Sequence, residues 1–483
     1  MQTITLPYWI FIVLLVFSAV MVLDRVLLPG MRWYLKRRVN RVIEEINTRL
    51  DIEIRPIQFT RRQSLIDQLV FDDKVIDAIK AYAEEHRMPH AVAQAKAQKY
   101  AAEIVPAFNA YIYFRIGYWL AKKLARLIYR VRVGFYDRDK LGNIDSNSSV
   151  VFVMNHRSNM DYVLVSFLVA ERTTLSYAVG EWARIWPLQS LIKAMGAFFV
   201  RRNSGNPLYR KVLERYINMS TRAGVCQAVF LEGGLSKDGA LRQPRLGFMD
   251  YMLRDYHQHS DKDIVFVPVG INYDRVIEDR SLLRQLEDTV ERRTPWFVIK
   301  TSAAFIFKNI LLSRKNRWHR FGYASVNFGE PVSAKAYCQL YDVDFSVLQT
   351  EQRFQQVEKL AGTILHNIER VIPVLPVALM CSVLLKYRDS WKSELELKSA
   401  CAEKIGQLER AGAPIDISPG ALESILGAAL DILVGRSLIE EQDNLIRMKP
   451  AELDIIKYYA NSIAHWESPG TDSLRNISST AHD

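Results

Sequence analysis

The chain has 483 residues, 49% hydrophobic and 24% charged, which suits a folded protein with a sizeable core. Its net charge of +11 favours anionic partners such as acidic lipid surfaces and phosphorylated substrates. Nucleic acid is not an expected partner, because no zinc-finger, helix-turn-helix or RNA-binding-sheet signature accompanies the charge. Four scattered cysteines without a C-x-x-C pair argue against a disulfide framework and a zinc site, so we expect no metal.

Residues 1–30 are predicted to form a transmembrane or membrane-anchoring helix. The run from residue 6 to 23 is apolar and uncharged, and its length is near the minimum for a bilayer span. Basic residues follow this run and none precedes it, which places the remaining chain on the cytoplasmic side of the inner membrane. A buried or interfacial helix is the alternative for this segment.

Residues 31–132 are predicted to be a helical region that ends in a basic amphipathic segment. Residues 111–133 mix aromatic, aliphatic and basic side chains without one acid. This composition fits a helix at a membrane interface, with anionic lipid as its partner, and equally fits a core helix with a solvated basic face. A second basic and aromatic stretch, residues 310–320, is a further candidate for a membrane-facing patch.

Residues 133–345 are predicted to form an α/β domain. Short apolar runs alternate with helical stretches, which indicates a mixed, largely parallel sheet flanked by helices. One helix is expected from Pro207 to Arg222, with Asn206 as its N-cap. The expected strands are residues 133–136, 150–154, 175–179, 198–200, 228–231, 264–269 and 324–328.

Residues 346–466 are predicted to form a helical C-terminal domain, and residues 467–483 a disordered polar tail. The apolar run from residue 374 to 385 lies between two prolines. It is too short to span a bilayer and is better interpreted as a buried helix.

The first segment with chemical potential follows the apolar run 150–154. His156 comes just after this predicted strand, and Asp161 lies one helical turn into the next element. This spacing suits a general base oriented by a carboxylate. A second strand leads into Arg201 and Arg202, whose side chains point to opposite faces if extended, so that one can bind a ligand while the other braces the structure.

The third segment ends a predicted strand at Glu232, followed by Gly233 and Gly234, which permit positive φ and close approach of a ligand. Glu232 is suited to binding a substrate hydroxyl or bracing an arginine; a plain tight turn is the alternative. The fourth segment contains Pro268 within an apolar run, which marks an edge, a bulge or a chain that ends near a ligand.

The order and spacing of these segments resemble the glycerolipid acyltransferase superfamily, and within it the membrane glycerol-3-phosphate acyltransferases. His156, Arg157, Ser158, Asp161 and Tyr162 resemble the motif H-R-S-x-x-D-Y. Further resemblance covers G-A-F-F-V-R-R at 196–202, P-V-G-I-N-Y-D-R at 268–275, and the segments 327–331 and 458–465. It extends over roughly residues 100–466, from which we expect the fold of that superfamily.

The resemblance implies acyl transfer from acyl-CoA or acyl carrier protein to the sn-1 hydroxyl of glycerol 3-phosphate, without a cofactor. Dihydroxyacetone-phosphate or lysophosphatidate acylation, and non-catalytic lipid binding, are the alternatives. By resemblance, His156 is the base and Asp161 orients it. The implied substrate-binding residues are Arg157, Ser158, Arg201, Arg202, Glu232, Gly233, Ser236, Lys237 and Pro268.

One departure from the family pattern concerns the third segment. The family usually has arginine after the glycines and again two positions later, where this chain has Leu235 and Lys237. Lysine does not replace the bidentate contact that arginine makes with phosphate. Arg242 and Arg245 are candidates to compensate, and the departure leaves the exact acceptor open.

Overall fold

The structure, a computed structural model, describes residues 58, 60–135, 141–169, 173–180, 188–201, 204–286, 321–415, 417 and 421–467. The predicted membrane segment 6–23, the basic stretch 310–320, Arg202 and the tail after residue 467 lie outside these ranges. Within them, no helix combines the length and the apolar character that a bilayer crossing requires.

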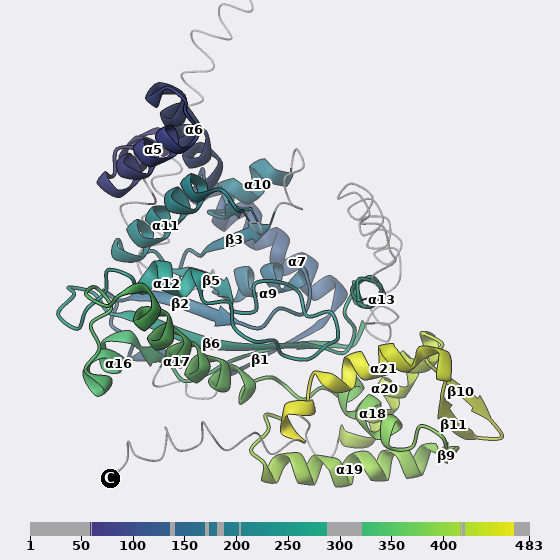
Figure 1. Ribbon diagram of the computed structural model, residues 1–483. Coiled ribbons are helices and arrows are strands. Elements are labelled where there is room, and N and C mark those ends of the chain that lie inside the picture. Colours follow the sequence, from purple (N-terminus) through teal and green to yellow (C-terminus); the bar gives the residue numbers. More distant parts are fainter. Residues whose placement is uncertain are drawn as a thin grey trace, which may run out of the picture.

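The described residues form an eight-stranded mixed sheet (Figure 1). The strands run in the order β1-β7-β6-β2-β5-β3-β4, and β8 pairs with β6. Five of them, β6, β2, β5, β3 and β4, are mutually parallel, whereas β7 and β8 run antiparallel to β6 and β1 runs parallel to β7. The predicted mixed, largely parallel sheet is confirmed. The strands are β1 (Arg130–Phe135), β2 (Ser149–Met154), β3 (Ser176–Gly180), β4 (Phe198–Val200), β5 (Gln227–Phe230), β6 (Ile264–Tyr273), β7 (Tyr323–Phe328) and β8 (Val332–Ser333).

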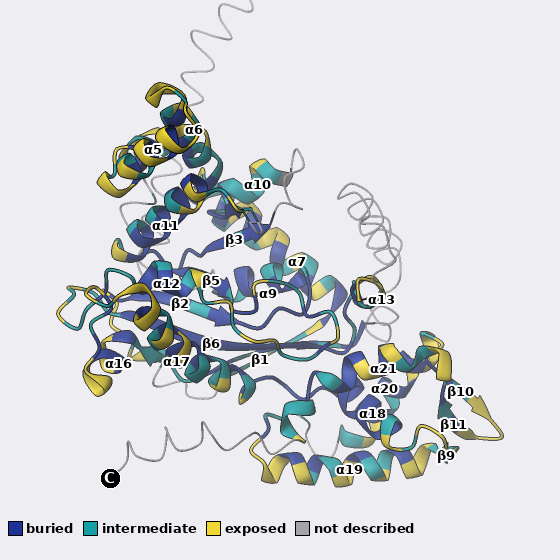
Figure 2. Cartoon of the chain, viewed as in Figure 1, coloured by how far each residue is buried: buried dark blue, intermediate teal, exposed yellow. Residues whose placement is uncertain are grey.

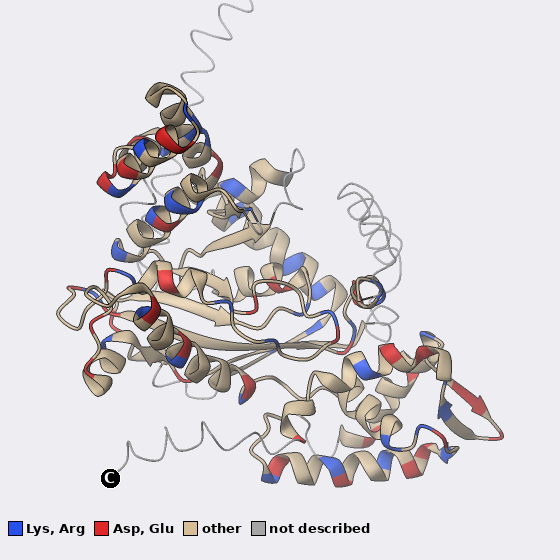
Figure 3. Cartoon of the chain, viewed as in Figure 1, with Lys and Arg blue, Asp and Glu red and all other residues tan. Residues whose placement is uncertain are grey.

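The central strands are apolar on both faces because helices cover both sides of the sheet. Successive residues of β2 alternate between two cores: Val150 and Met154 belong to one, and Val151 and Val153 to the other. Strands β2, β5 and β6 contain no charged residue, and Figure 3 shows the charges on the surrounding helices and loops. Figure 2 shows the same strands as mostly buried.

Helices η2 (Ile112–Gly117), α7 (Tyr118–Ile128) and α9 (Met160–Val169) contribute to the first core, and α11 (Pro207–Arg222), α12 (Gly247–Leu253) and α17 (Thr350–Glu369) to the second. The side chain of Asn206 accepts from the N–H of Tyr209, which confirms the predicted cap of α11. Smaller helices complete this part: α10 (Leu188–Ala194), α13 (Asp279–Arg284) and α16 (Ala334–Tyr341). Three amino-terminal helices pack on α11 and on each other: α4 (Arg62–Val70), α5 (Asp73–Glu85) and α6 (His90–Ile104).

The C-terminal region is helical, as predicted, but it also contains a small antiparallel sheet that the prediction missed. Its strands are β9 (Lys392–Ser393), β10 (Ile439–Gln442) and β11 (Leu445–Met448). Helix α18 (Pro376–Lys386) is the expected buried helix, and α21 (Leu453–Asn461) packs against it. The remaining elements are α19 (Glu394–Arg410), α20 (Leu422–Gly435), η5 (Pro450–Glu452) and η6 (Ala464–Trp466).

Candidate functional site

The loop after β2 is fixed to the neighbouring strand before it reaches His156. The side-chain amide of Asn155 donates to the carbonyl oxygen of Ile271 at 2.9 Å and accepts from the N–H of the same residue at 2.8 Å. Asn155 is buried, so this reciprocal pair ties the end of β2 to β6. His156 therefore stands at the carboxyl ends of the parallel strands, where open α/β sheets bind their ligands.

The predicted contact between His156 and Asp161 is present. The Nδ1 atom of His156 lies 2.9 Å from Oδ2 of Asp161, and the two residues are 2% and 0% exposed. Helix α9 begins at Met160, so Asp161 sits in its first turn, where a carboxylate is favoured by the helix dipole.

Asp161 accepts three further hydrogen bonds. The N–H groups of Arg157 and Ser158 donate to Oδ2 at 2.7 and 3.0 Å, and the hydroxyl of Tyr273 donates to Oδ1 at 2.5 Å. All four groups donate to this one carboxyl group, and a carboxylate offers only acceptors. The proton of the neutral His156 imidazole then lies on Nδ1, and Nε2 keeps its lone pair for a reacting group.

The His156 ring lines a cavity of about 100 Å³ whose other walls are largely apolar. The ring stacks on Phe230, with centroids 3.7 Å apart, and meets Tyr162 edge-on at 5.5 Å. The cavity runs along the carboxyl ends of β3, β4 and β5 to helix α12. Its further lining residues are Ala178, Val179, Gly180, Val200, Val229, Leu231, Gly233, Arg245, Phe248 and Met249.

Glu232 connects the loop after β5 to the His156 loop. Its carboxyl oxygens accept from the N–H of His156 at 2.8 Å and from the N–H of Arg242 at 3.1 Å. Burial raises the pKa of Glu232 from 4.5 to about 7, although these two hydrogen bonds oppose the shift. The N–H of Ser236 donates to the His156 carbonyl at 2.9 Å, so both main-chain groups of His156 are held by this loop.

Arg157 is buried beneath the C-terminal helix α21. Its guanidinium lies 4.7 Å from the ring centroid of Tyr458 and donates to the carbonyl oxygen of Gly239. Its Nε and second Nη atoms have no hydrogen-bond partner among the described residues. The main chain of α21 lies so close to Gly239 that a Cβ on this glycine would be 1.8 Å from the carbonyl oxygen of Tyr458.

Comparison with known proteins agrees with this arrangement. Residues 135–272 match the family described as acyltransferase, and residues 307–467 match the glycerol-3-phosphate acyltransferase C-terminal region. The chain is therefore similar to glycerol-3-phosphate acyltransferases in its C-terminal region and to acyltransferases in the region before it. Both family regions therefore contribute to the site, the first through His156 and Asp161 and the second through Tyr458.

Relatives named glycerol-3-phosphate acyltransferase match along most of this chain. The protein of Pseudomonas entomophila is 28% identical over 433 residues, and that of Alteromonas mediterranea 26% over 420 residues. Each match covers 84% of this chain and 49% of the relative, so the chain spans about half the length of these relatives. A solved structure titled as the 1-acyl-sn-glycerophosphate (LPA) acyltransferase from Thermotoga maritima matches at 15% identity and a TM-score of 0.28, covering 53% of this chain and 77% of that chain.

Of the predicted substrate-binding residues that the structure describes, only Gly233 lines the cavity beside His156. Its φ of +67° confirms the expected positive φ after β5. Glu232 and Ser236 are buried with main-chain partners; the Ser236 hydroxyl donates to the Ala240 carbonyl at 2.7 Å. The Lys237 amine is exposed and donates to the Gln285 carbonyl at 3.2 Å.

Arg201 is the structural member of the predicted arginine pair. Its guanidinium forms a bidentate ion pair with Glu103 at 2.9 and 2.6 Å and lies 5.2 and 5.1 Å from the ring centroids of Tyr100 and Tyr209. It thereby joins α6 to the end of β4, and it is not among the cavity residues. Arg201 thus braces the structure, which was the role expected for one member of the pair, and its assignment to substrate binding stays a prediction. Arg202 lies outside the described residues.

Pro268 marks a bulge, one of the three options that its sequence position left open. Its carbonyl accepts from the N–H of Gly329 at 2.8 Å. Between the pairs Val269–Phe328 and Phe266–Val332, the chain from β7 to β8 has one more residue than β6. Proline is tolerated because its missing N–H faces this irregular stretch. Pro268 does not line the cavity beside His156, and its assignment to substrate binding stays a prediction.

Three positioning residues were not predicted from the sequence. Tyr273 binds Asp161, Tyr458 covers Arg157, and Glu278 accepts from the Ser158 hydroxyl at 2.7 Å and from the Asn159 amide at 3.1 Å. Burial raises the pKa of Glu278. The tyrosines belong to segments that carried the family resemblance, but nothing in the sequence showed which partner each would meet. Within the described ranges, no cluster of three His, Cys, Asp or Glu side chains is arranged to hold a metal.

Proposed function

We propose that this protein transfers an acyl group from an acyl thioester to the sn-1 hydroxyl of glycerol 3-phosphate. The observation that carries the proposal is the buried His156–Asp161 pair at the wall of an apolar cavity. Similarity to known proteins supports the substrate class, because relatives that match most of the chain are named for this acceptor. An apolar cavity suits an acyl chain. His156 lines this cavity, and Arg245 is the only Lys or Arg among the described lining residues.

In this reaction the acceptor hydroxyl gives its proton to Nε2 of His156 while its oxygen attacks the thioester carbonyl carbon. Collapse of the tetrahedral intermediate breaks the carbon–sulfur bond, and the imidazolium returns the proton to the leaving thiolate. Asp161 stabilises the imidazolium because its carboxylate accepts from Nδ1. No acyl-enzyme is required.

The donors that stabilise the oxyanion are limited by the hydrogen bonds already present. The N–H groups of Arg157 and Ser158 donate to Asp161, and that of Gly233 donates to the Phe230 carbonyl. These three N–H groups already have acceptors and are therefore not available to stabilise the oxyanion.

Arg245 is our choice for the acceptor-phosphate anchor in place of the missing motif arginine. It lines the cavity beside His156, and its side chain makes no hydrogen bond or ion pair within the part of the chain that the structure describes. Its position is fixed, because its N–H donates to the Leu231 carbonyl at 2.7 Å. The Lys237 amine donates to the Gln285 carbonyl, and Leu235 is uncharged and packs against the core. Neither residue therefore supplies a cation to the cavity in place of the motif arginines.

The proposal is tested by incubating the purified full chain with acyl-CoA and a panel of acceptors, followed by product identification. Glycerol 3-phosphate should be acylated in preference to dihydroxyacetone phosphate and lysophosphatidate. His156→Ala should lower turnover by roughly 10³-fold or more. His366→Ala is the matched control, because His366 is half-exposed on α17 and pairs with Glu369, away from the cavity residues. Near-normal turnover in His156→Ala, or consumption of acyl-CoA without an acceptor, would refute the proposal.

A further inference from the structure

The outward face of η2 and α7 exposes large apolar side chains. Ile116, Trp119 and Leu120 are 44%, 58% and 44% exposed. A helix on the surface of a water-soluble domain normally turns polar side chains outward. Three large apolar residues on one outer face form a patch of the kind that marks an interaction surface.

Packing on the opposite side fixes which face looks outward. Gly117, Ala121 and Ala125 are buried and recur at every fourth position, and α7 packs against α9. Small residues allow a close approach between neighbouring helices, and at the end of η2 a Cβ on Gly117 would lie 2.9 Å from the end of Met195, which follows α10. The helix therefore has little freedom to rotate its apolar outer residues inward.

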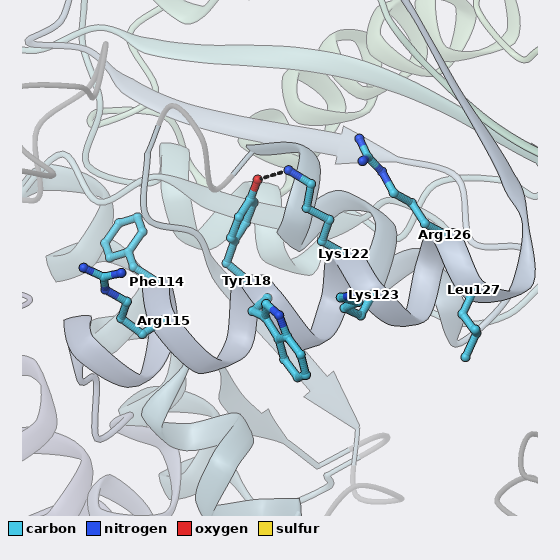
Figure 4. A pocket seen from close by; sticks show the side chains of 8 residues that line it. Phe114, Arg115, Tyr118, Lys122, Lys123, Arg126 and Leu127 are labelled. Atoms are coloured by element: carbon cyan, nitrogen blue, oxygen red, sulfur yellow. Dashed lines mark hydrogen bonds between the residues drawn. The ribbon is translucent and has the colours of Figure 1, made fainter. Parts of the chain in front are cut away.

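Basic side chains surround this apolar face. Residues 111–135 contain no Asp or Glu, and the described wall of a cavity of about 680 Å³ includes Arg115, Lys122, Lys123 and Arg126. In Figure 4, Lys122 and Arg126 extend from one side of α7 and Leu127 from the other. The Lys122 amine donates to the Tyr118 hydroxyl at 2.7 Å, so the cation and the aromatic ring lie on the same side of the helix.

We propose that this face of η2 and α7 binds the surface of an anionic membrane. Trp119 and its apolar neighbours enter the boundary between headgroups and acyl chains, while the Lys and Arg heads remain at the level of the lipid phosphates. Charge complementarity selects this occupant. A second copy of the same face would oppose cation to cation, which repels.

A membrane bound at this face lies one helix away from the site of the proposed reaction. Helix α9, against which α7 packs, carries Asp161 in its first turn. Acyl donors and products that partition into the bilayer would therefore meet the protein on the side of the oriented base.

The test uses a fluorescent label on the full chain. All four native cysteines are buried, so a cysteine introduced by Trp119→Cys can be labelled selectively with an environment-sensitive dye. The matched control is Leu395→Cys on α19, where the native side chain is 77% exposed. Each labelled protein is titrated with vesicles of phosphatidylcholine alone and of equal parts phosphatidylcholine and phosphatidylglycerol. A label at a fixed position reports on this face even if another segment also anchors the chain.

We expect the label at position 119 to shift to the blue with phosphatidylglycerol vesicles, and the label at position 395 to stay unchanged. Adding Lys123→Gln and Arg126→Gln should raise the lipid concentration needed for half of the spectral change by roughly 25-fold, since each basic residue contributes about five-fold. Equal shifts at both positions, or equal responses to both vesicle types, would overturn the proposal. A label at 119 that is already shielded before lipid is added would also overturn it, because another segment or a second copy would then cover the face.

Discussion

Replacement of Asp161 by asparagine isolates the charge of the group that orients His156. In Asp161→Asn, the amide oxygen should take the place of Oδ2, because the N–H groups of Arg157 and Ser158 both donate there. The amide nitrogen then faces the Tyr273 hydroxyl, which can turn to accept. The His156 Nδ1–H keeps an acceptor and the same tautomer, so the variant loses the negative charge and little of the geometry.

The expected loss follows from the electrostatics of the reaction. A carboxylate and an imidazolium about 4 Å apart attract by roughly 4 kcal/mol at an effective dielectric constant of about 20. Removing most of that attraction lowers turnover by roughly 10²–10³-fold. A variant in which the ring lost its tautomer would fall further, by about 10⁴-fold as in serine proteases.

The assay is acyl transfer from labelled acyl-CoA to glycerol 3-phosphate, with thermal unfolding measured in parallel. Tyr273→Phe is the control, since it removes one donor to Asp161 but leaves the carboxylate; its turnover should fall by less than about 10-fold. A change of less than about three-fold in Asp161→Asn, with an unchanged melting temperature, would refute the assigned role of the carboxylate.

Three further outcomes are expected. Arg245→Ala should raise KM for glycerol 3-phosphate by roughly 10-fold or more with little effect on KM for acyl-CoA, whereas Arg242→Ala should change both little; an effect on the donor alone would exclude the phosphate role. Because the folded-state pKa of Glu232 is about 7, above 4.5, its ionisation removes up to about 3 kcal/mol of stability as pH rises through this window. The melting temperature of Glu232→Gln should therefore rise relative to that of the wild type as the pH increases from 5 to 8. A difference that does not change with pH would contradict the raised pKa of Glu232. Gly239→Ala should destabilise the protein by roughly 2 kcal/mol or more because its Cβ would collide with the main chain of α21, while Gly247→Ala, with open space around it, should be nearly neutral; similar melting temperatures would contradict the close approach.

The sheet could be predicted because its strands are short apolar runs between helical patterns. Their positions follow from composition, but their pairing order depends on contacts between distant residues, which periodicity does not reveal. The small sheet in the C-terminal region was missed because β9 has two residues and β10 is mostly polar. Asp443 and Asn444, both with positive φ, form its two-residue hairpin turn, and this pair was the available signal.

The candidate site likewise combines contacts that the sequence predicts with contacts that it does not reveal. The contact of His156 with Asp161 could be predicted because both lie within one strand-to-helix turn. The partner of Arg201 could not, since Glu103 is 98 residues away and reaches it only through the packing of α6. Motif residues such as Glu232 were expected to touch substrate, but their oxygens hold loops instead, which sequence patterns do not distinguish from ligand binding.

The position of β7 has a consequence for how this protein can be divided. β7 falls within the stretch 307–467 that matches the C-terminal region of the family, yet it lies between β1 and β6 in the main sheet. A truncation before residue 307 would strip β6 of a partner along half of its length and detach β1. The two matched regions are therefore not exchangeable modules, and a chimaera that joins them from different relatives must recreate this strand pairing.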